Sequence, residues 1–240
     1  MSLNYGAVSD RGKVRVENED DYLVLLKEDF SLLAVADGMG GHNCGELASS
    51  LTIEVIKSYQ FSVDNLVQNM RSLISQANQK IYHKSEEKEE YYGMGTTLTL
   101  GVIKDRILTI GHIGDSRAYL FRNGDLSQIT QDHSMVEELI RKKIITSEEA
   151  EDHPQKNMLT NALGVDEDVN FDLVEVNLEE DDLILLCSDG LTNMLSEEQI
   201  IEVLAKQSNL QQGAETLVEL ANQAGGRDNI TVIIYAVELS

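Results

Sequence analysis

Tryptophan is absent from this sequence of 240 residues, and proline (Pro154) and cysteine (Cys44 and Cys187) are scarce. Two cysteines are too few for a disulfide framework, so we expect a reducing, cytoplasmic setting. No apolar run approaches the roughly 20 residues that span a bilayer, and the N-terminus has no signal-peptide pattern, which argues against a membrane protein. With so little proline and no Ser/Gly-rich stretch, no linker can be identified, and we predict a single domain over residues 1–240.

Positive charge is scarce as well, because 19 lysines and arginines stand against 42 aspartates and glutamates, which gives a net charge of −23. A nucleic-acid-binding protein normally carries a basic stripe, and none is visible, so we exclude nucleic acid as a partner. Acidity around a site would instead raise the local concentration of cations. Without an anchor or an additional domain in the sequence, we expect a free-standing monomer.

Four short acidic segments recur along the chain: Asp37-Gly38, Gly114-Asp115, Ser188-Asp189-Gly190 and Arg227-Asp228-Asn229. Three of them follow apolar runs that are typical of buried strands. One Asp beside a Gly is an ordinary turn. Four in a chain of this size indicate carboxylates that converge at a sheet edge on hard divalent cations, which take oxygen ligands. The pattern predicts a metal-dependent enzyme.

Apolar periodicity predicts many strands in hairpin order with helices in pairs between them. The predicted strands span residues 5–9, 22–26, 31–36, 96–103, 106–113, 117–122, 126–129, 171–176, 183–187 and 230–236. The predicted helices span residues 45–59, 63–83, 197–205 and 211–223. The third strand is expected to stop at Asp37 and to lead into a glycine-rich turn over residues 38–42.

This order of elements favours an α+β fold over alternating βαβ units. We predict a four-layer sandwich, with two central antiparallel β-sheets flanked by pairs of α-helices. Residues 131–165 differ from the strand-rich segment before them, because two short amphipathic helices are expected at 135–141 and 147–152. We call residues 131–165 the flap segment, because they are expected to form a helical insertion on the β framework.

The acidic segments belong to a longer ordered pattern, which resembles the bacterial branch of the metal-dependent Ser/Thr protein phosphatases, the type 2C or PPM family. The segments that carry the resemblance are Ser9-Asp10-Arg11-Gly12, Arg15-Val16-Glu17-Asn18-Glu19-Asp20, Ala36-Asp37-Gly38-Met39-Gly40-Gly41-His42, Gly95-Thr96-Thr97, Gly114-Asp115-Ser116-Arg117, Asp132-His133-Ser134, Cys187-Ser188-Asp189-Gly190-Leu191 and Gly226-Arg227-Asp228-Asn229. Each is weak alone, whereas eight in the family's order are specific.

The resemblance implies hydrolysis of phosphoserine and phosphothreonine in proteins without a phosphoenzyme intermediate. It implies a binuclear Mn²⁺ or Mg²⁺ centre whose bridging water attacks phosphorus in line. Carried over by position, Asp37 bridges the two ions and the Gly38 carbonyl joins it on one of them. Asp189 and Asp228 bind the other. The implied partners are phosphorylated proteins, including a Ser/Thr kinase.

The remaining roles also come from the resemblance. Glu19 and Asp20 match residues that hold metal-bound waters, although Asp21 continues this acidic run and leaves open which side chain faces a metal. Asp115, together with Asp189, matches a third metal site of bacterial relatives. Arg15 matches the arginine that grips the substrate phosphate, which suits its bidentate donors.

Several groups could act as the general acid that protonates the leaving alkoxide. Histidine titrates in the right range, which makes His42 a candidate. In animal relatives the histidine directly follows the Asp-Gly pair, whereas Met39 occupies that place here. His42 could instead organise water or lead into a helix, and a metal-bound water could serve as the acid.

The flap segment is expected to contact substrate around Ser134 and Asn161. The family pattern often has arginine where this chain has Asn161, so we expect this flap to select different peptides. Cys44 lies close in sequence to the glycine-rich turn. It could be a packed thiol, or it could have a redox role.

Each assignment has a structural alternative. Asp37, Asp115, Asp189 and Asp228 could only organise turns, Thr96 and Thr97 are expected to pack in a strand, and Arg15 could pair with Glu17 or Glu19. At the level of function, the alternatives are a pseudophosphatase used as a regulatory binding module and a small-molecule phosphomonoesterase. The retained carboxylates argue against the first, and the sequence discriminates poorly against the second.

Overall fold

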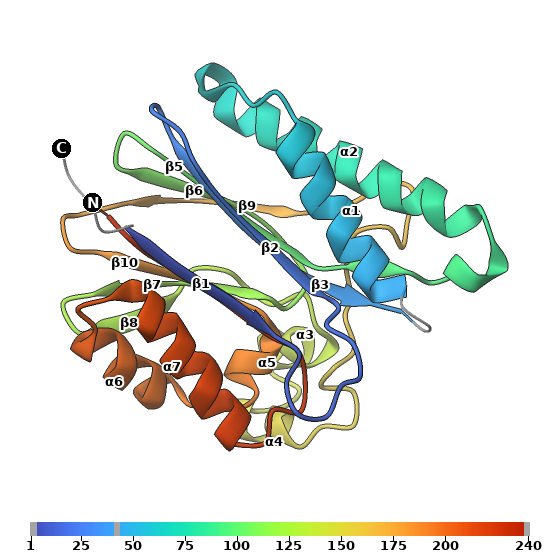
Figure 1. Cartoon of the computed structure of the whole chain (residues 1–240). Helices are drawn as coiled ribbons and strands as arrows, with labels where there is room; N and C mark the ends of the chain where they lie inside the picture. Colours follow the sequence, from blue (N-terminus) through green and yellow to red (C-terminus); the bar gives the residue numbers. More distant parts are fainter. Residues whose placement is uncertain (1–3, 41–43, 238–240) are drawn as a thin grey trace.

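The computed structural model describes residues 4–40 and 44–237, and it contains two antiparallel sheets stacked face to face with helices on both outer sides (Figure 1). The first sheet has the order β1 (Tyr5–Asp10), β11 (Ile230–Ala236), β10 (Leu183–Cys187), β7 (Arg117–Arg122) and β8 (Asp125–Gln128). The second has the order β2 (Asp20–Leu26), β3 (Ser31–Met39), β5 (Leu98–Lys104), β6 (Ile107–Ile113) and β9 (Asp172–Asn177), and β4 (Gly95–Thr96) pairs with the end of β3.

Two pairs of helices cover the outer faces of the sheets. Helices α1 (Cys44–Ser58) and α2 (Leu66–Glu86) pack on the second sheet, and α6 (Glu197–Lys206) and α7 (Leu210–Gln223) pack on the first. The predicted α+β sandwich with flanking helices is therefore confirmed. In the described part of the chain, no helix has the length and apolar character needed to cross a membrane.

Alternation along β3 explains how the fold produces a site between its sheets. Successive side chains of a strand point to opposite faces. Leu32 and Ala34 pack against the α1–α2 layer, while Leu33 and Val35 pack against the other sheet in the buried centre of the sandwich. Asp37 continues the face of Leu33 and Val35. It therefore comes where the apolar core between the sheets ends.

The prediction that the third strand stops at Asp37 is wrong. β3 continues to Met39, because β4 supplies a partner for its last residues, with Gly38 opposite Thr96 and Met39 opposite Gly95. Gly38 is enclosed there: a Cβ atom on it would lie 2.1 Å from the Gly45 carbonyl oxygen. The turn predicted at Gly38 is thus a strand. His42 falls outside the described residues.

The flap segment contains the two predicted short helices, α3 (Met135–Arg141) and α4 (Ser147–Glu151). Ser134 caps α3 by accepting a hydrogen bond from the Glu137 amide, and Thr146 and Glu149 form a capping box on α4. A short helix α5 (Asp189–Thr192) was not predicted. It follows β10 directly, so Asp189 begins a helical turn at the end of a buried strand.

Candidate metal centre and phosphate site

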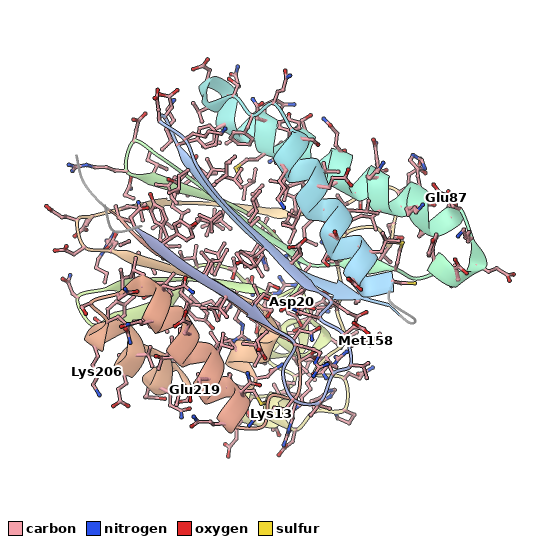
Figure 2. The ribbon with its side chains drawn as sticks, in the orientation of Figure 1. Lys13, Asp20, Glu87, Met158, Lys206 and Glu219 are labelled. Atoms are coloured by element: carbon pink, nitrogen blue, oxygen red, sulfur yellow. The ribbon has the colours of Figure 1, made fainter. Side chains whose placement is uncertain are left out.

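The predicted site residues converge at one end of the sandwich, around a cavity of about 520 Å³. Those that line it are Arg15, Glu19, Asp37, Gly38, Asp115, Asp189, Asp228 and, from the flap segment, Asn161. They come from the ends of several strands and from the loops between them. Figure 2 labels Asp20, which pairs with Asp37 across the strands, and Met158, which lines the cavity from the flap segment.

Burial and, after it, mutual repulsion raise the proton affinity of the carboxylates at this cavity. Burial is the largest cause, and it raises the pKa of Asp20 and Asp115 to about 7 and that of Asp189 to about 6. Burial, followed by the charges of Asp20, Asp189 and Asp115, raises the pKa of Asp37 well above its ordinary value. At neutral pH these groups therefore repel one another, and a cation would relieve that repulsion.

Two carboxylate oxygens fit the requirements of a metal site. Oδ1 of Asp20 and Oδ1 of Asp189 are buried and accept no hydrogen bond, and unpartnered buried acceptors are costly. Carboxylate oxygens are the ligands that Mg²⁺ and Mn²⁺ prefer. The donor set of Asp37, Asp189, Asp228 and the Gly38 carbonyl, with Asp115 beside it, therefore suits hard divalent cations.

The carboxylates are nevertheless not arranged as a finished set of ligands. Within residues 4–40 and 44–237, no three His, Cys, Asp or Glu side chains form a group that could hold an ion as they stand. Arg15 Nη2 donates to Asp228 Oδ2 at 2.7 Å, so a cation would have to share or displace this partner.

Asp20 joins the two sheets. Its Oδ2 accepts hydrogen bonds at 2.7 Å from the hydroxyls of Ser188 and Thr231, both of which belong to the opposite sheet or its edge. Its Cα lies opposite that of Asp37 in the strand register. Asp21 points to the other face of β2, toward Lys57 of α1. The structure thus separates the acidic run: Asp20 lies between the sheets, and Asp21 does not.

Glu19 and Arg15 face the cavity together. Arg15 Nη1 lies 3.7 Å from Glu19 Oε2, in addition to its contact with Asp228. The Glu19 carboxylate lies against Gly45, where a Cβ atom would be 2.6 Å from Oε1. The sequence-based alternative of a pairing between Arg15 and Glu19 is therefore present, but inside the cavity, where the guanidinium can also meet an anion.

Asn229 is a residue whose role the sequence did not reveal. Its Oδ1 accepts from the Glu19 amide at 2.8 Å, and its Nδ2 donates to the carbonyls of Arg11 and Glu17 at 2.9 Å. It therefore fixes the loop that carries Arg15 beside the turn that carries Asp228. The only sequence signal was its place directly after Asp228 in a recurring motif.

Thr96 and Thr97 do more than pack. The Asp37 amide donates to Thr97 Oγ1 at 3.0 Å, and Thr96 Oγ1 donates to the Asp37 carbonyl at 2.9 Å. Thr97 Oγ1 also shares a hydrogen bond with Ser116 Oγ at 2.8 Å. These hydroxyls hold the main chain of Asp37 on both sides, so the expectation of simple strand packing was incomplete.

The two flap residues named from sequence occupy different places. Asn161 lines the cavity, with its Nδ2 donating to the Asn170 carbonyl at 2.5 Å. Ser134 is buried as the cap of α3 and lines a neighbouring cavity of about 700 Å³, which shares Asp115 and Asp189 with the first. Their contact with substrate stays a prediction.

Cys44 is buried at the start of α1. Its thiol donates to the Glu90 carbonyl at 2.9 Å, and burial raises its pKa, which disfavours the reactive thiolate. Of the two open alternatives, this geometry supports the packed thiol.

Replacing Asn229 with alanine should loosen the Arg15 loop. We expect the free energy of unfolding to fall by about 2–4 kcal/mol, because three hydrogen bonds are lost and their backbone partners are left unpaired. We expect kcat/KM for a phosphorylated substrate to fall by at least about tenfold, because small displacements of positioning groups are costly. Urea denaturation and steady-state rates measure the two effects. Asn69→Ala is the matched control, because Asn69 is half-buried in the first turn of α2, donates to the Asn65 carbonyl and does not line the cavity. Equal effects of both variants would contradict the role of Asn229.

The chain is similar to several known proteins over most of its length. A family model described as "Protein phosphatase 2C" matches residues 13–223. The chain is similar to the Serine/threonine phosphatase stp of Listeria monocytogenes, with 38% identity over 239 residues that cover 97% of this chain and 95% of that protein. It is also similar to the solved structure of the S. agalactiae serine/threonine phosphatase, with a TM-score of 0.92 and 37% identity over 98% of this chain and 99% of the other.

A further similar structure is described as the catalytic domain of the serine threonine protein phosphatase PstP in complex with 2 manganese ions. It has a TM-score of 0.87 and 38% identity, and the match covers 97% of this chain and 96% of that one. The manganese ions belong to that protein's structure.

Proposed function

The chain belongs to the protein phosphatase 2C family of metal-dependent Ser/Thr phosphatases, and from this premise we propose that it hydrolyses phosphoserine and phosphothreonine in proteins at the cavity between its sheets. The observation that carries the proposal is the convergence of Asp37, Asp189 and Asp228 on one cavity that also holds Arg15. A carboxylate cluster suits cations and a guanidinium suits phosphate. Their combination in one cavity supports phosphoryl chemistry.

We propose two divalent cations, Mn²⁺ or Mg²⁺, with Asp37 shared between them. The Gly38 carbonyl would join Asp37 on one cation, and Asp189 and Asp228 would hold the other. Asp115 borders both cavities, which supports a third, additional ion between Asp115 and Asp189. When bound, such ions supply an activated water for in-line attack and positive charge that offsets the charge of the phosphoryl oxygens.

The protein's own residues provide the rest. Arg15 would bind the phosphate oxygens through its two terminal nitrogens, at the cost of its contact with Asp228. Glu19, beside Arg15, would orient water near the phosphate. Asp20 would direct Oδ1, which accepts no hydrogen bond, toward the same site, while the hydroxyls of Ser188 and Thr231 hold Oδ2 in place. His42 stays one candidate for the general acid.

The biological setting follows by analogy with the family. We propose that the chain acts as a single catalytic domain and as a monomer, on proteins phosphorylated by a bacterial Ser/Thr kinase and on that kinase itself. We also propose a reducing, cytoplasmic setting, in which the buried thiols of Cys44 and Cys187 would stay reduced.

The test is phosphate release from a phosphothreonine peptide and from p-nitrophenyl phosphate, each with Mn²⁺ and with excess chelator. We expect Mn²⁺-dependent turnover of the peptide that chelator abolishes. Turnover of p-nitrophenyl phosphate alone would point to a small-molecule phosphomonoesterase. No turnover of either compound by folded, Mn²⁺-loaded protein would point to a regulatory module.

A further inference from the structure

The cavity is lined by two chemically different groups of side chains. Arg15 and the carboxylates come from the sheet ends and from the loop over residues 11–19. The flap segment and Met39 also line it, with five apolar side chains and with the polar side chains of Asn157, Thr160 and Asn161. We call the apolar group the apolar wall, and it consists of Met39, Met158, Leu159, Ala162 and Val165.

Two residues of the apolar wall are unusually exposed. Met158 and Val165 each have a relative exposure of 49%. Among the described residues, nine large apolar side chains are exposed, and Met158 and Val165 are the two of them that line the cavity. Scattered apolar residues need no explanation, whereas a group of them at a cavity marks a binding surface.

The apolar wall stands on a fixed backbone. Thr96 and Leu163 exchange two main-chain hydrogen bonds, of 3.1 and 2.9 Å, which tie the flap segment to β4 beside Val165. The side chains of Met39 and Val165 both approach Gly95, within 2.7 and 3.2 Å of the position that a Cβ atom would take. The wall on this side is therefore preformed, which reduces the entropy lost on binding.

The main chain of Met158 is held as well. Its carbonyl accepts from the Met135 amide at 2.8 Å, and its amide donates to the Gln155 carbonyl at 3.0 Å. Its thioether side chain can adapt to apolar groups of different shape. Met158 thus combines a fixed position with an adaptable surface.

We propose that the apolar wall binds an aliphatic side chain next to the phosphorylated residue, so that the preferred substrates are phosphopeptides with such a neighbour. This inference rests on the proposed function, because the phosphate side of the cavity fixes where the peptide lies. Arg15 is the only lysine or arginine among the described residues that line the cavity, and the phosphate engages it. An acidic neighbour would therefore find no second lysine or arginine side chain, and the carboxylates of Glu19 and Asp166 would repel it.

The experiment measures kcat/KM of the parent and of two variants on a set of phosphopeptides, all with Mn²⁺. The peptides carry phosphothreonine among alanines, with one leucine or one aspartate at each position from −2 to +2. For the parent, we expect leucine at one position to raise kcat/KM by about tenfold over alanine, as is typical of one apolar side chain in a pocket, and aspartate there to lower it. In the double variant Met158→Ala, Val165→Ala, we expect that preference to fall below about twofold.

Ile144→Ala is the matched control, because Ile144 is 63% exposed and lies in the same flap segment without lining the cavity. It should keep the leucine preference. The inference is overturned if the parent hydrolyses the alanine peptide without preferring leucine, or if the double variant keeps the full preference. Failure of the parent to hydrolyse any of these peptides would instead refute the proposed function.

Discussion

Mn²⁺-dependent phosphatase activity is expected to fall by on the order of 10³-fold or more when Asp37 is replaced by asparagine. Asparagine keeps the shape of the side chain but removes the negative charge that would be shared between two cations. The position of Asp37 is fixed independently of its charge, because the hydroxyls of Thr96 and Thr97 form hydrogen bonds with its main chain on both sides. The variant should therefore fold normally and fail in catalysis.

Asp21→Asn provides the matched control for this prediction. Asp21 lies on β2, one residue after the partner of Asp37, but it faces Lys57 on the helix side of the sheet. Phosphate release from a phosphothreonine peptide, measured over a range of Mn²⁺ concentrations, should be near the parental rate for Asp21→Asn. Comparable losses in both variants would show that general acidity of this edge, not the position of Asp37, supports activity.

Metal-free protein is expected to lose at least about 2 kcal/mol of unfolding free energy between pH 5 and pH 8, at about 1.36 kcal/mol per unit of pKa shift. The folded state raises the pKa of Asp20 and Asp115 to about 7 and of Asp189 to about 6, from an ordinary value of 3.8. Folded protein therefore binds more protons than unfolded protein in this range. Stability is then highest at low pH and falls as pH rises through the folded pKa values.

One buried histidine opposes this trend. Burial lowers the pKa of His112 to about 4, so its contribution grows as pH rises from about 4 to its ordinary value of 6.5. A single imidazole is outweighed by several carboxyls whose shifts have the opposite sign and extend to higher pH. The net expected change remains a loss of stability with rising pH.

Bound Mn²⁺ should reverse the direction of this pH dependence. Protons compete with the cation for the same carboxylates, so affinity increases with pH, and at 100 times its dissociation constant a ligand adds about 2.7 kcal/mol. Urea denaturation at pH 5, 6.5 and 8, with chelator and with Mn²⁺, measures both slopes. Asp37→Asn should stabilise the metal-free protein at pH 8. Parallel slopes with and without Mn²⁺ would contradict a cation site built from these carboxylates.

Local sequence was sufficient for much of the fold. The alternation and apolar content of β3, β5, β6, β10 and β11 predicted strands, and the three- and four-residue spacing in α1, α2, α6 and α7 predicted helices. The order of hairpins and helix pairs then led to the two-sheet sandwich, which is confirmed. These patterns are local, because each depends on which side of its own element meets the core.

Errors occurred where a distant segment changed the outcome. β3 extends to Met39 because Gly95 and Thr96, more than 50 residues later, pair with it. Asn229 carries no sign in the sequence that it binds the amide of Glu19. Side chains that hold others in place act through contacts between elements, and a single sequence does not contain those contacts.

The sequence by itself determined the kinds of groups at the site, namely carboxylates at the ends of buried strands and an arginine in a polar loop. Only the tertiary structure decided which of them meet. Strand alternation and register place Asp20 and Asp37 between the sheets and Asp21 outside them, although the three are chemically alike. The same stacking brings the flap segment to the cavity that the carboxylates line and so forms the apolar wall. The physical reason is that the composition of a site is local, whereas its geometry depends on long-range pairing of strands and layers.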